Sequence, residues 1–177
     1  MKMVNLLILF LFVGVTSLLG TEYTVNKEAS MVTFKIRHAV VAKVEGKFNE
    51  FSGTYGYDEN SSTFSSFIGE VQTASVNTDE KYRDKHLKEK VFEVEKYPTM
   101  KLELLKQDGN SFETALTIKD ITKEINMTIS LVAGVKNMFI LSGEISRKDF
   151  GLTFSDTSTV GDMSVGDKIE INILFGG

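Results

Sequence analysis

An alternation of apolar and polar residues with a period of two is the feature that most constrains this chain. The segments VTFKIRH (32–38), FETALTI (112–118) and EINMTIS (124–130) all show it. Side chains two positions apart point to the same face of a β-strand, so each segment predicts a strand with one buried face. Similar segments recur as far as residue 175 and together predict about eight strands.

Short polar segments separate the predicted strands. DENSS (58–62), QDGN (107–110) and residues 119–123 have the composition of turns. The apolar phase changes at Asn49 and Glu50, inside what reads as one long strand, and this predicts a β-bulge that bends the sheet. Pro98, the single proline, lies just before a strand, where its missing N–H is tolerated.

One region departs from the period of two. Residues 78–90 are rich in helix formers and predict a short helix, with Thr78 or Asp79 as its N-cap. Many antiparallel strands with one helical connection indicate a barrel or a sandwich. The apolar faces of the strands then either line a cavity that selects an apolar ligand or fill the core completely. Periodicity alone leaves both alternatives open.

The first twenty residues differ from the rest. Lys2 precedes an apolar run from Val4 to Leu19, and Gly20 follows. The run is short for a membrane-spanning helix, which needs about 20 apolar residues. It predicts a signal peptide at 1–20 and a soluble mature domain at 21–177, periplasmic or secreted and without a permanent membrane anchor. The alternative is an uncleaved anchor.

Charge and composition exclude several classes of protein. The net charge of −4 argues against a nucleic-acid partner. No block of Lys and Arg exceeds two residues, so the sequence alone predicts no patch for anionic membranes. Cysteine is absent, which excludes disulfides, thiolate metal sites and a Cys nucleophile. Composition and motifs predict no cofactor and no metal.

Several short motifs occur in an order that resembles the YceI family of secreted bacterial lipocalin-like proteins. They are YTVN from Tyr23, VTFKIRH to His38, GKFNEFSG (46–53), SVNT (75–78), YRDKHLKEKVFEVEKYP (82–98), LTIKDITKEI (116–125), SRKDFGL (146–152) and VGDKIEINI (165–173). The match extends across nearly all of residues 21–177. The resemblance implies an all-β, closed eight-stranded antiparallel lipocalin-like barrel with a short helical connection.

The resemblance also implies a function. The barrel would hold a long-chain apolar lipid, of the polyisoprenoid, isoprenoid quinone or fatty-acid amide type, as a carrier, store or stress-related binding protein and not an enzyme. The alternative is an envelope enzyme or redox accessory protein that holds a quinone-like cofactor. A homodimer is among the oligomeric states left open. The predicted ligand-binding residues are Phe34, Ile36, His38, Phe48, Phe51, Phe67, Val71, Phe92, Leu102, Leu116, Phe139 and Phe154.

The cluster Arg83, Asp84 and His86 could be taken for an active site. A His–Asp pair needs a nucleophile within reach, but the chain has no Cys and no G-x-S-x-G motif. A metal site needs at least three converging ligands, and the chain has two histidines, without an H-x-x-x-H pair. We therefore predict that the three residues and Leu87 form a structural joint, with a head-group contact as the alternative and catalysis third.

Overall fold

The computed structural model describes residues 21–38, 42–154 and 165–177, with the side chains of residues 37, 38 and 42 also left aside. The predicted signal peptide therefore lies outside the described residues. The strands are β1 (Thr21–Thr24), β2 (Met31–His38), β3 (Ala42–Phe48), β4 (Phe51–Asp58), β5 (Thr63–Gln72), β6 (Val76–Asn77), β7 (Thr99–Asp108), β8 (Ser111–Ile118), β9 (Ile121–Leu131), β10 (Met138–Ser146) and β11 (Val165–Gly176).

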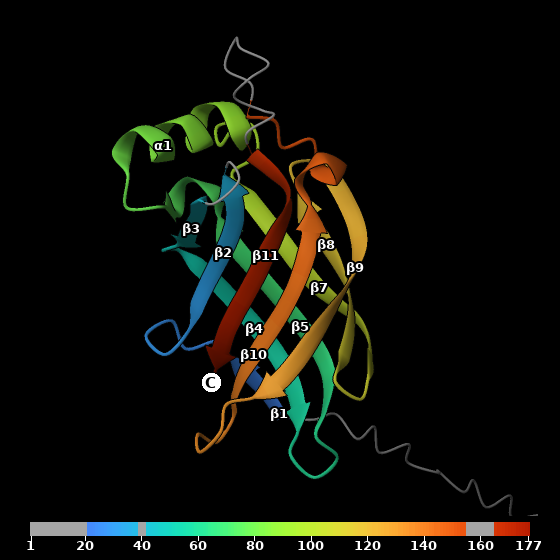
Figure 1. The fold of residues 1–177 in the computed structure, drawn as a ribbon. Helices are drawn as coiled ribbons and strands as arrows, with labels where there is room; N and C mark the ends of the chain where they lie inside the picture. The colour runs from blue at the N-terminus through green and yellow to red at the C-terminus, as the bar shows by residue number, and fades with distance from the viewer. Residues whose placement is uncertain (1–20, 39–41, 155–164) are drawn as a thin grey trace, which may run out of the picture.

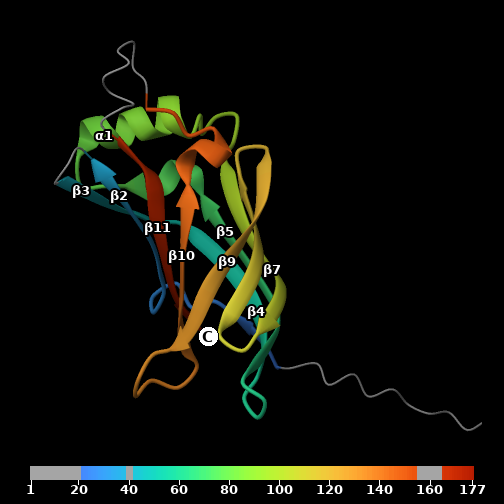
Figure 2. The same cartoon turned by 45° about the vertical axis from the view of Figure 1, so that its right-hand side comes forward.

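The described strands form one antiparallel sheet in the order β1-β4-β5-β7-β8-β9-β10-β11-β2-β3-β6. The sheet curls into a half-barrel, as Figures 1 and 2 show from two sides. The all-β class and antiparallel pairing are confirmed. The closed eight-stranded count is wrong, because eleven strands are described and no ladder joins β1 to β6.

The phase change at Asn49 and Glu50 explains one of the three additional strands, beside the short strands β1 and β6. It is not a bulge within one strand but the break between β3 and β4. β3 pairs with β2 and β6 near one edge of the sheet, whereas β4 pairs with β1 and β5 near the other. Because the two strands follow each other in the chain, the sheet must curl until its edges approach each other.

Two backbone hydrogen bonds strengthen this curl. After β1, the N–H of Val25 donates to the carbonyl of Gly53 at 2.9 Å. The next N–H, of Asn26, donates to Gly176 at 2.8 Å. The segment that follows β1 therefore bridges β4 and the end of β11.

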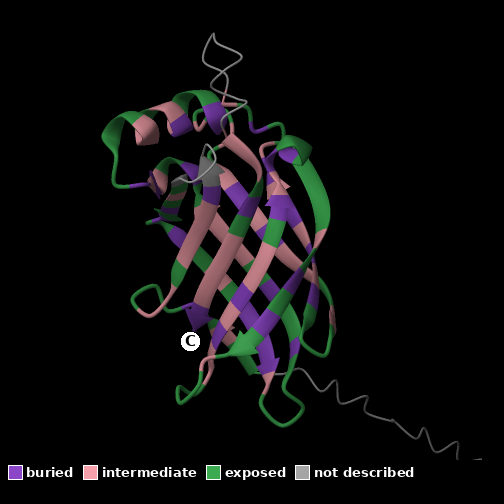
Figure 3. Cartoon of the chain, viewed as in Figure 1, coloured by how far each residue is buried: buried purple, intermediate pink, exposed green. Residues whose placement is uncertain are grey.

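The predicted turns are present where strands pair in hairpins. Asp108 pairs with Ser111, and Gly109 between them has a φ of 55°, a conformation that glycine adopts without strain. Ile118 pairs with Ile121 across Lys119 and Asp120, so this turn is shorter than the predicted 119–123, and residues 121–123 belong to β9. Figure 3 shows buried residues recurring along the strands between exposed and half-buried ones, as the period of two predicts.

The helical connection consists of α1 (Lys81–His86) followed by a π-helical turn, η2 (Leu87–Val91). It lies across one end of the half-barrel in both ribbon views (Figures 1 and 2). The predicted N-cap is wrong by one or two residues. The carboxylate of Glu80 caps the helix by accepting hydrogen bonds from the N–H groups of Tyr82 and Arg83, at 2.9 and 2.7 Å. No helix in the described residues is long and apolar enough to cross a membrane.

Candidate ligand-binding cavity

An apolar cavity of about 480 Å³ lies inside the curled sheet. Its lining comes from strands around the sheet, from α1 and η2 at one end, and from Phe67 and Phe175 toward the other. The lining is predominantly aliphatic and aromatic, with a few polar residues such as Arg83 and His86. A cavity of this volume and composition suits one small or medium-sized apolar ligand or part of a longer one.

The alternation of the strands creates this lining. On β2, Phe34 and Ile36 point into the cavity, whereas Lys35 between them forms an ion pair with Glu45 of β3 at 2.8 Å. That ion pair raises the pKa of Lys35 and lowers the pKa of Glu45, chiefly through their hydrogen bond. One face of the strand therefore lines the cavity with apolar side chains, and the other face forms a solvent-exposed ion pair.

The end of the half-barrel opposite α1 is filled by rings, which we call the aromatic cluster: Tyr55, Tyr57, Phe64, Phe112, Phe139 and Phe175. Its members lie beside the β4–β5 and β7–β8 hairpins, at the start of β10 and at the end of β11, away from α1 (Figure 1). The ring of Phe139 lies 4.8 Å from that of Phe64 and 4.9 Å from that of Tyr57, edge to face.

The aromatic cluster forms the floor of the cavity. Phe175 belongs to the cluster and also lines the cavity, and its ring centroid lies 4.8 Å from that of Phe67. Burial raises the pKa of the Tyr55 phenol, which is inaccessible to solvent. At the side opposite α1, the cavity therefore ends on buried aromatic rings.

The structure brings together most of the predicted ligand-binding residues. Ten of the twelve line the cavity: Phe34, Ile36, Phe48, Phe51, Phe67, Val71, Phe92, Leu102, Leu116 and Phe154. Phe139 is not on the lining and lies within the aromatic cluster, because its strand begins at the filled end. The side chain of His38 lies outside the described residues.

Sequence reasoning missed other lining residues. Val44, Ile169 and Ile171 lie on strands whose alternation is visible in the sequence, so the period of two could have identified them as lining residues. Val25 and Leu152 lie in connections, where no period identifies them.

Arg147 is a further residue whose importance the sequence did not reveal. It lies in η3 (Arg147–Phe150) and is 1 % exposed. Its guanidinium donates to the carbonyls of Leu152 at 2.8 Å, Gly166 at 3.1 Å and Val165 at 3.3 Å. It also lies over the ring of Phe154, at 5.3 Å. Arg147 therefore fixes Leu152 and Phe154, two residues of the cavity wall.

The Arg83–Asp84 pair meets at Thr78, a buried residue that follows β6. The Thr78 N–H and hydroxyl donate to Asp84 Oδ1 at 2.8 and 2.5 Å. Arg83 Nε donates to the same hydroxyl, and Arg83 Nη2 to the Thr78 carbonyl, both at 2.8 Å. These bonds attach α1 to the sheet.

The other members of the predicted joint lie at the cavity. Leu87 is buried and lines the cavity. Arg83 and His86 reach the lining as well, so a contact with a ligand head group is geometrically open to them. Within the described residues, no group of three His, Asp or Glu side chains could hold a metal ion. The chemistry that this geometry offers is the burial of apolar surface.

Comparison with known proteins assigns the chain to a family. The model of the YceI-like domain matches residues 23–175. The chain belongs to the YceI-like domain family. A UPF0312 protein of Pectobacterium atrosepticum and protein YceI of Salmonella newport are each 30 % identical to it over 151 residues, which cover 77 % of this chain and 79 % of each relative.

Several solved structures share this fold. The Campylobacter jejuni YCEI protein is 30 % identical, with a TM-score of 0.63 over 81 % of this chain and 90 % of its own. Burkholderia cenocepacia BcnA is 21 % identical, with a TM-score of 0.70 over 86 % and 99 %. A polyisoprenoid binding domain from Saccharophagus degradans is 12 % identical, with a TM-score of 0.63 over 86 % and 95 %. The last two show a shared fold alone.

Proposed function

We propose that this YceI-like protein is a lipid-binding protein and not an enzyme, and that it holds one long apolar chain in the cavity. The observation that carries the proposal is the apolar lining of a cavity of about 480 Å³ that ends on the aromatic cluster. The polyisoprenoid-binding name of the Saccharophagus degradans domain supports a ligand of this class. Polyisoprenoids, isoprenoid quinones and fatty-acid amides all carry a chain of the required kind.

The test is mass spectrometry of organic extracts from the purified protein, compared between two variants. Val71→Phe adds bulk on the cavity face of β5, whereas Ile68→Phe adds an aromatic ring on the exposed face of the same strand. We expect wild type and Ile68→Phe to yield a long-chain lipid in similar molar ratio, and Val71→Phe to yield much less. Equal lipid in all three proteins, or no lipid after incubation with candidate lipids, contradicts the proposal.

We also propose that the protein acts outside the cytoplasm, as a periplasmic or secreted carrier or store. The apolar run after Lys2 supports this proposal because it has the length of a signal peptide. N-terminal sequencing of the protein from fractionated cells tests it. A mature chain that starts near Thr21 in the periplasmic or extracellular fraction is expected. An intact Met1 in the membrane fraction contradicts it.

A further inference from the structure

The helical segment α1–η2 has two faces with opposite properties. Its inner face is anchored by Leu87 and Val91, both buried, and by Phe92 just after it. Tyr82, Arg83, His86 and Leu87 contribute to the lining of the cavity. The segment therefore borders the end of the cavity that the aromatic cluster does not close.

The segment is basic although the protein is acidic. Residues 81–91 contain five basic and two acidic side chains, a net charge of +3, whereas the whole chain carries −4. The lysines are separated by one to three other residues, so they form no block in the sequence. Helical folding nevertheless gathers them, because Lys81, Lys85 and Lys88 line one shallow depression with Asp84 and Glu89.

The nearby carboxylates are mostly engaged elsewhere. Asp84 accepts hydrogen bonds from Thr78, and Glu80 caps the helix. Glu93 pairs with Lys119 of the β8–β9 turn, which lowers the pKa of Glu93. Asp79 and Glu95 flank the segment, outside residues 81–91.

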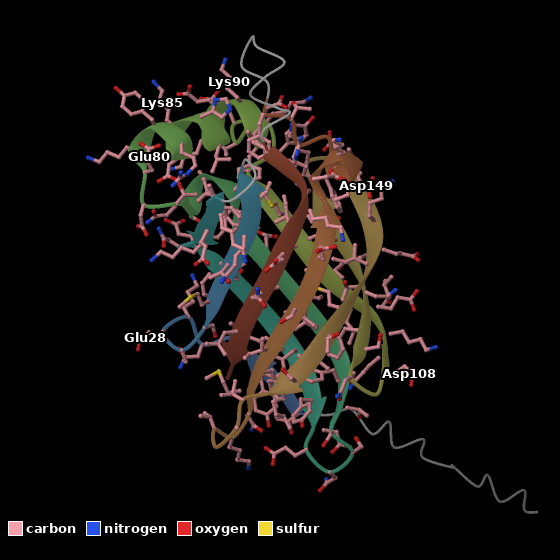
Figure 4. All side chains as sticks on the ribbon, viewed as in Figure 1. Glu28, Glu80, Lys85, Lys90, Asp108 and Asp149 are labelled. Atoms are coloured by element: carbon pink, nitrogen blue, oxygen red, sulfur yellow. The ribbon has the colours of Figure 1, made fainter. Side chains whose placement is uncertain are left out.

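The lysines of the outer face keep their charge available. Within the described residues, Lys81, Lys88 and Lys90 have no carboxylate within ion-pair distance. Lys85 lies 3.9 Å from Glu89, and its side chain is 71 % exposed. Figure 4 shows Lys85 and Lys90 pointing away from the half-barrel.

An aromatic residue accompanies these lysines. Tyr82 is 86 % exposed, the most exposed large hydrophobic side chain among the described residues. A phenol ring with a polar tip is suited to the boundary between lipid head groups and acyl chains. Lysines beside such a ring match the chemistry of an anionic bilayer surface.

We propose that the outer face of α1–η2 docks this protein on an anionic lipid bilayer, with the α1 end of the cavity facing the membrane. The purpose of such docking, transfer of a lipid between bilayer and cavity, rests on the proposed function. The docking itself is peripheral and reversible, because its attraction is electrostatic and is screened by salt.

The experiment is flotation of the purified protein with vesicles. The vesicles contain about 30 mol % phosphatidylglycerol in phosphatidylcholine, or phosphatidylcholine alone, at low salt and at about 0.5 M salt. The test variant is Lys81→Gln/Lys85→Gln/Lys90→Gln, and the matched control is Lys27→Gln/Lys106→Gln/Lys136→Gln. All six lysines are exposed, and both variants change the net charge equally.

We expect wild type and the control to bind phosphatidylglycerol vesicles at low salt and to dissociate at high salt. The test variant should bind on the order of 100-fold more weakly, about 5-fold per lysine. Tyr82→Ser in the wild-type background should also weaken vesicle binding, although it leaves the net charge unchanged. Equal binding by the two triple variants overturns the proposal, and so does failure of wild type to bind.

A parallel measurement separates this proposal from the proposed function. Lipid content of the same preparations is determined by mass spectrometry. Lipid in the cavity without vesicle binding overturns the docking alone. Charge-dependent vesicle binding with a cavity that takes up no lipid leaves the docking in place and contradicts the proposed function.

Discussion

The two ends of the half-barrel are built from the same strands but differ in what fills them. At the end away from α1, six buried aromatic rings pack against one another, edge to face or tilted, and fill the interior. Toward α1, the inward positions carry mainly aliphatic residues such as Ile36, Leu102, Leu116 and Ile169, and a cavity remains. The period of two is identical at both ends, so the volume of the inward side chains decides whether the interior is core or cavity.

Removal of a ring from the filled end tests this comparison with the largest expected effect. Phe139→Ala should lower the free energy of unfolding by about 3–5 kcal/mol, because Phe139 is 1 % exposed and its loss leaves a void among rigid rings. Phe34→Ala at the cavity wall should cost roughly half as much, because Phe34 already borders empty volume.

Urea unfolding of both variants gives the answer. Phe139→Ala should lose clearly more free energy of unfolding than Phe34→Ala. Equal losses would mean that the two ends are packed alike.

The attachment of α1 gives a second, smaller effect at the cavity end. Asp84→Ala removes the acceptor of two Thr78 hydrogen bonds and should cost about 1–3 kcal/mol. Asp108→Ala, in an exposed hairpin, should change stability by less than about 0.5 kcal/mol.

Melting temperature and lipid binding are measured together in both Asp variants. Lipid affinity of Asp84→Ala should fall only as far as the order of the helix falls. Unchanged stability with abolished lipid binding would instead assign the Arg83–Asp84 region to the ligand head group, and abolished turnover of a substrate would restore the active-site interpretation.

The smallest expected effect appears only at alkaline pH. Burial raises the pKa of Tyr55 above its usual value of 10.0, so the folded state holds the phenolic proton more tightly than the unfolded state does. The stability that this provides is present below about pH 10 and is lost as the pH rises through the folded-state pKa.

Tyr55→Phe has no such proton to lose. Its free energy of unfolding should decline less between about pH 9 and 11 than that of wild type. Tyr82→Phe is the control, because it removes an exposed phenol and should follow the wild-type profile. Parallel pH profiles for all three proteins would show that the filled end is not dry.

The sequence predicted most of the long strands, most turns and the helical connection, because each depends on local periodicity or turn composition. It missed the short strands β1 and β6, which are too short to show a period. It did not predict the break at Asn49 and Glu50, since a change of phase looks the same whether the strand bulges or ends. It also could not assign Phe139 to the filled end, because alternation identifies the inward face of a strand but not the height along the barrel. Whether the interior is hollow depends on packing between strands that are distant in sequence.

The most direct test of the account is the affinity of the delipidated protein for a series of ligands with one head group and increasing tail length. Each methylene buried contributes about 0.8 kcal/mol, so the dissociation constant should fall about 4-fold per methylene until the tail reaches Phe67 and Phe175, and then level off. Phe67→Ala should move that plateau to longer tails. An affinity that does not change with tail length in wild type would contradict the account.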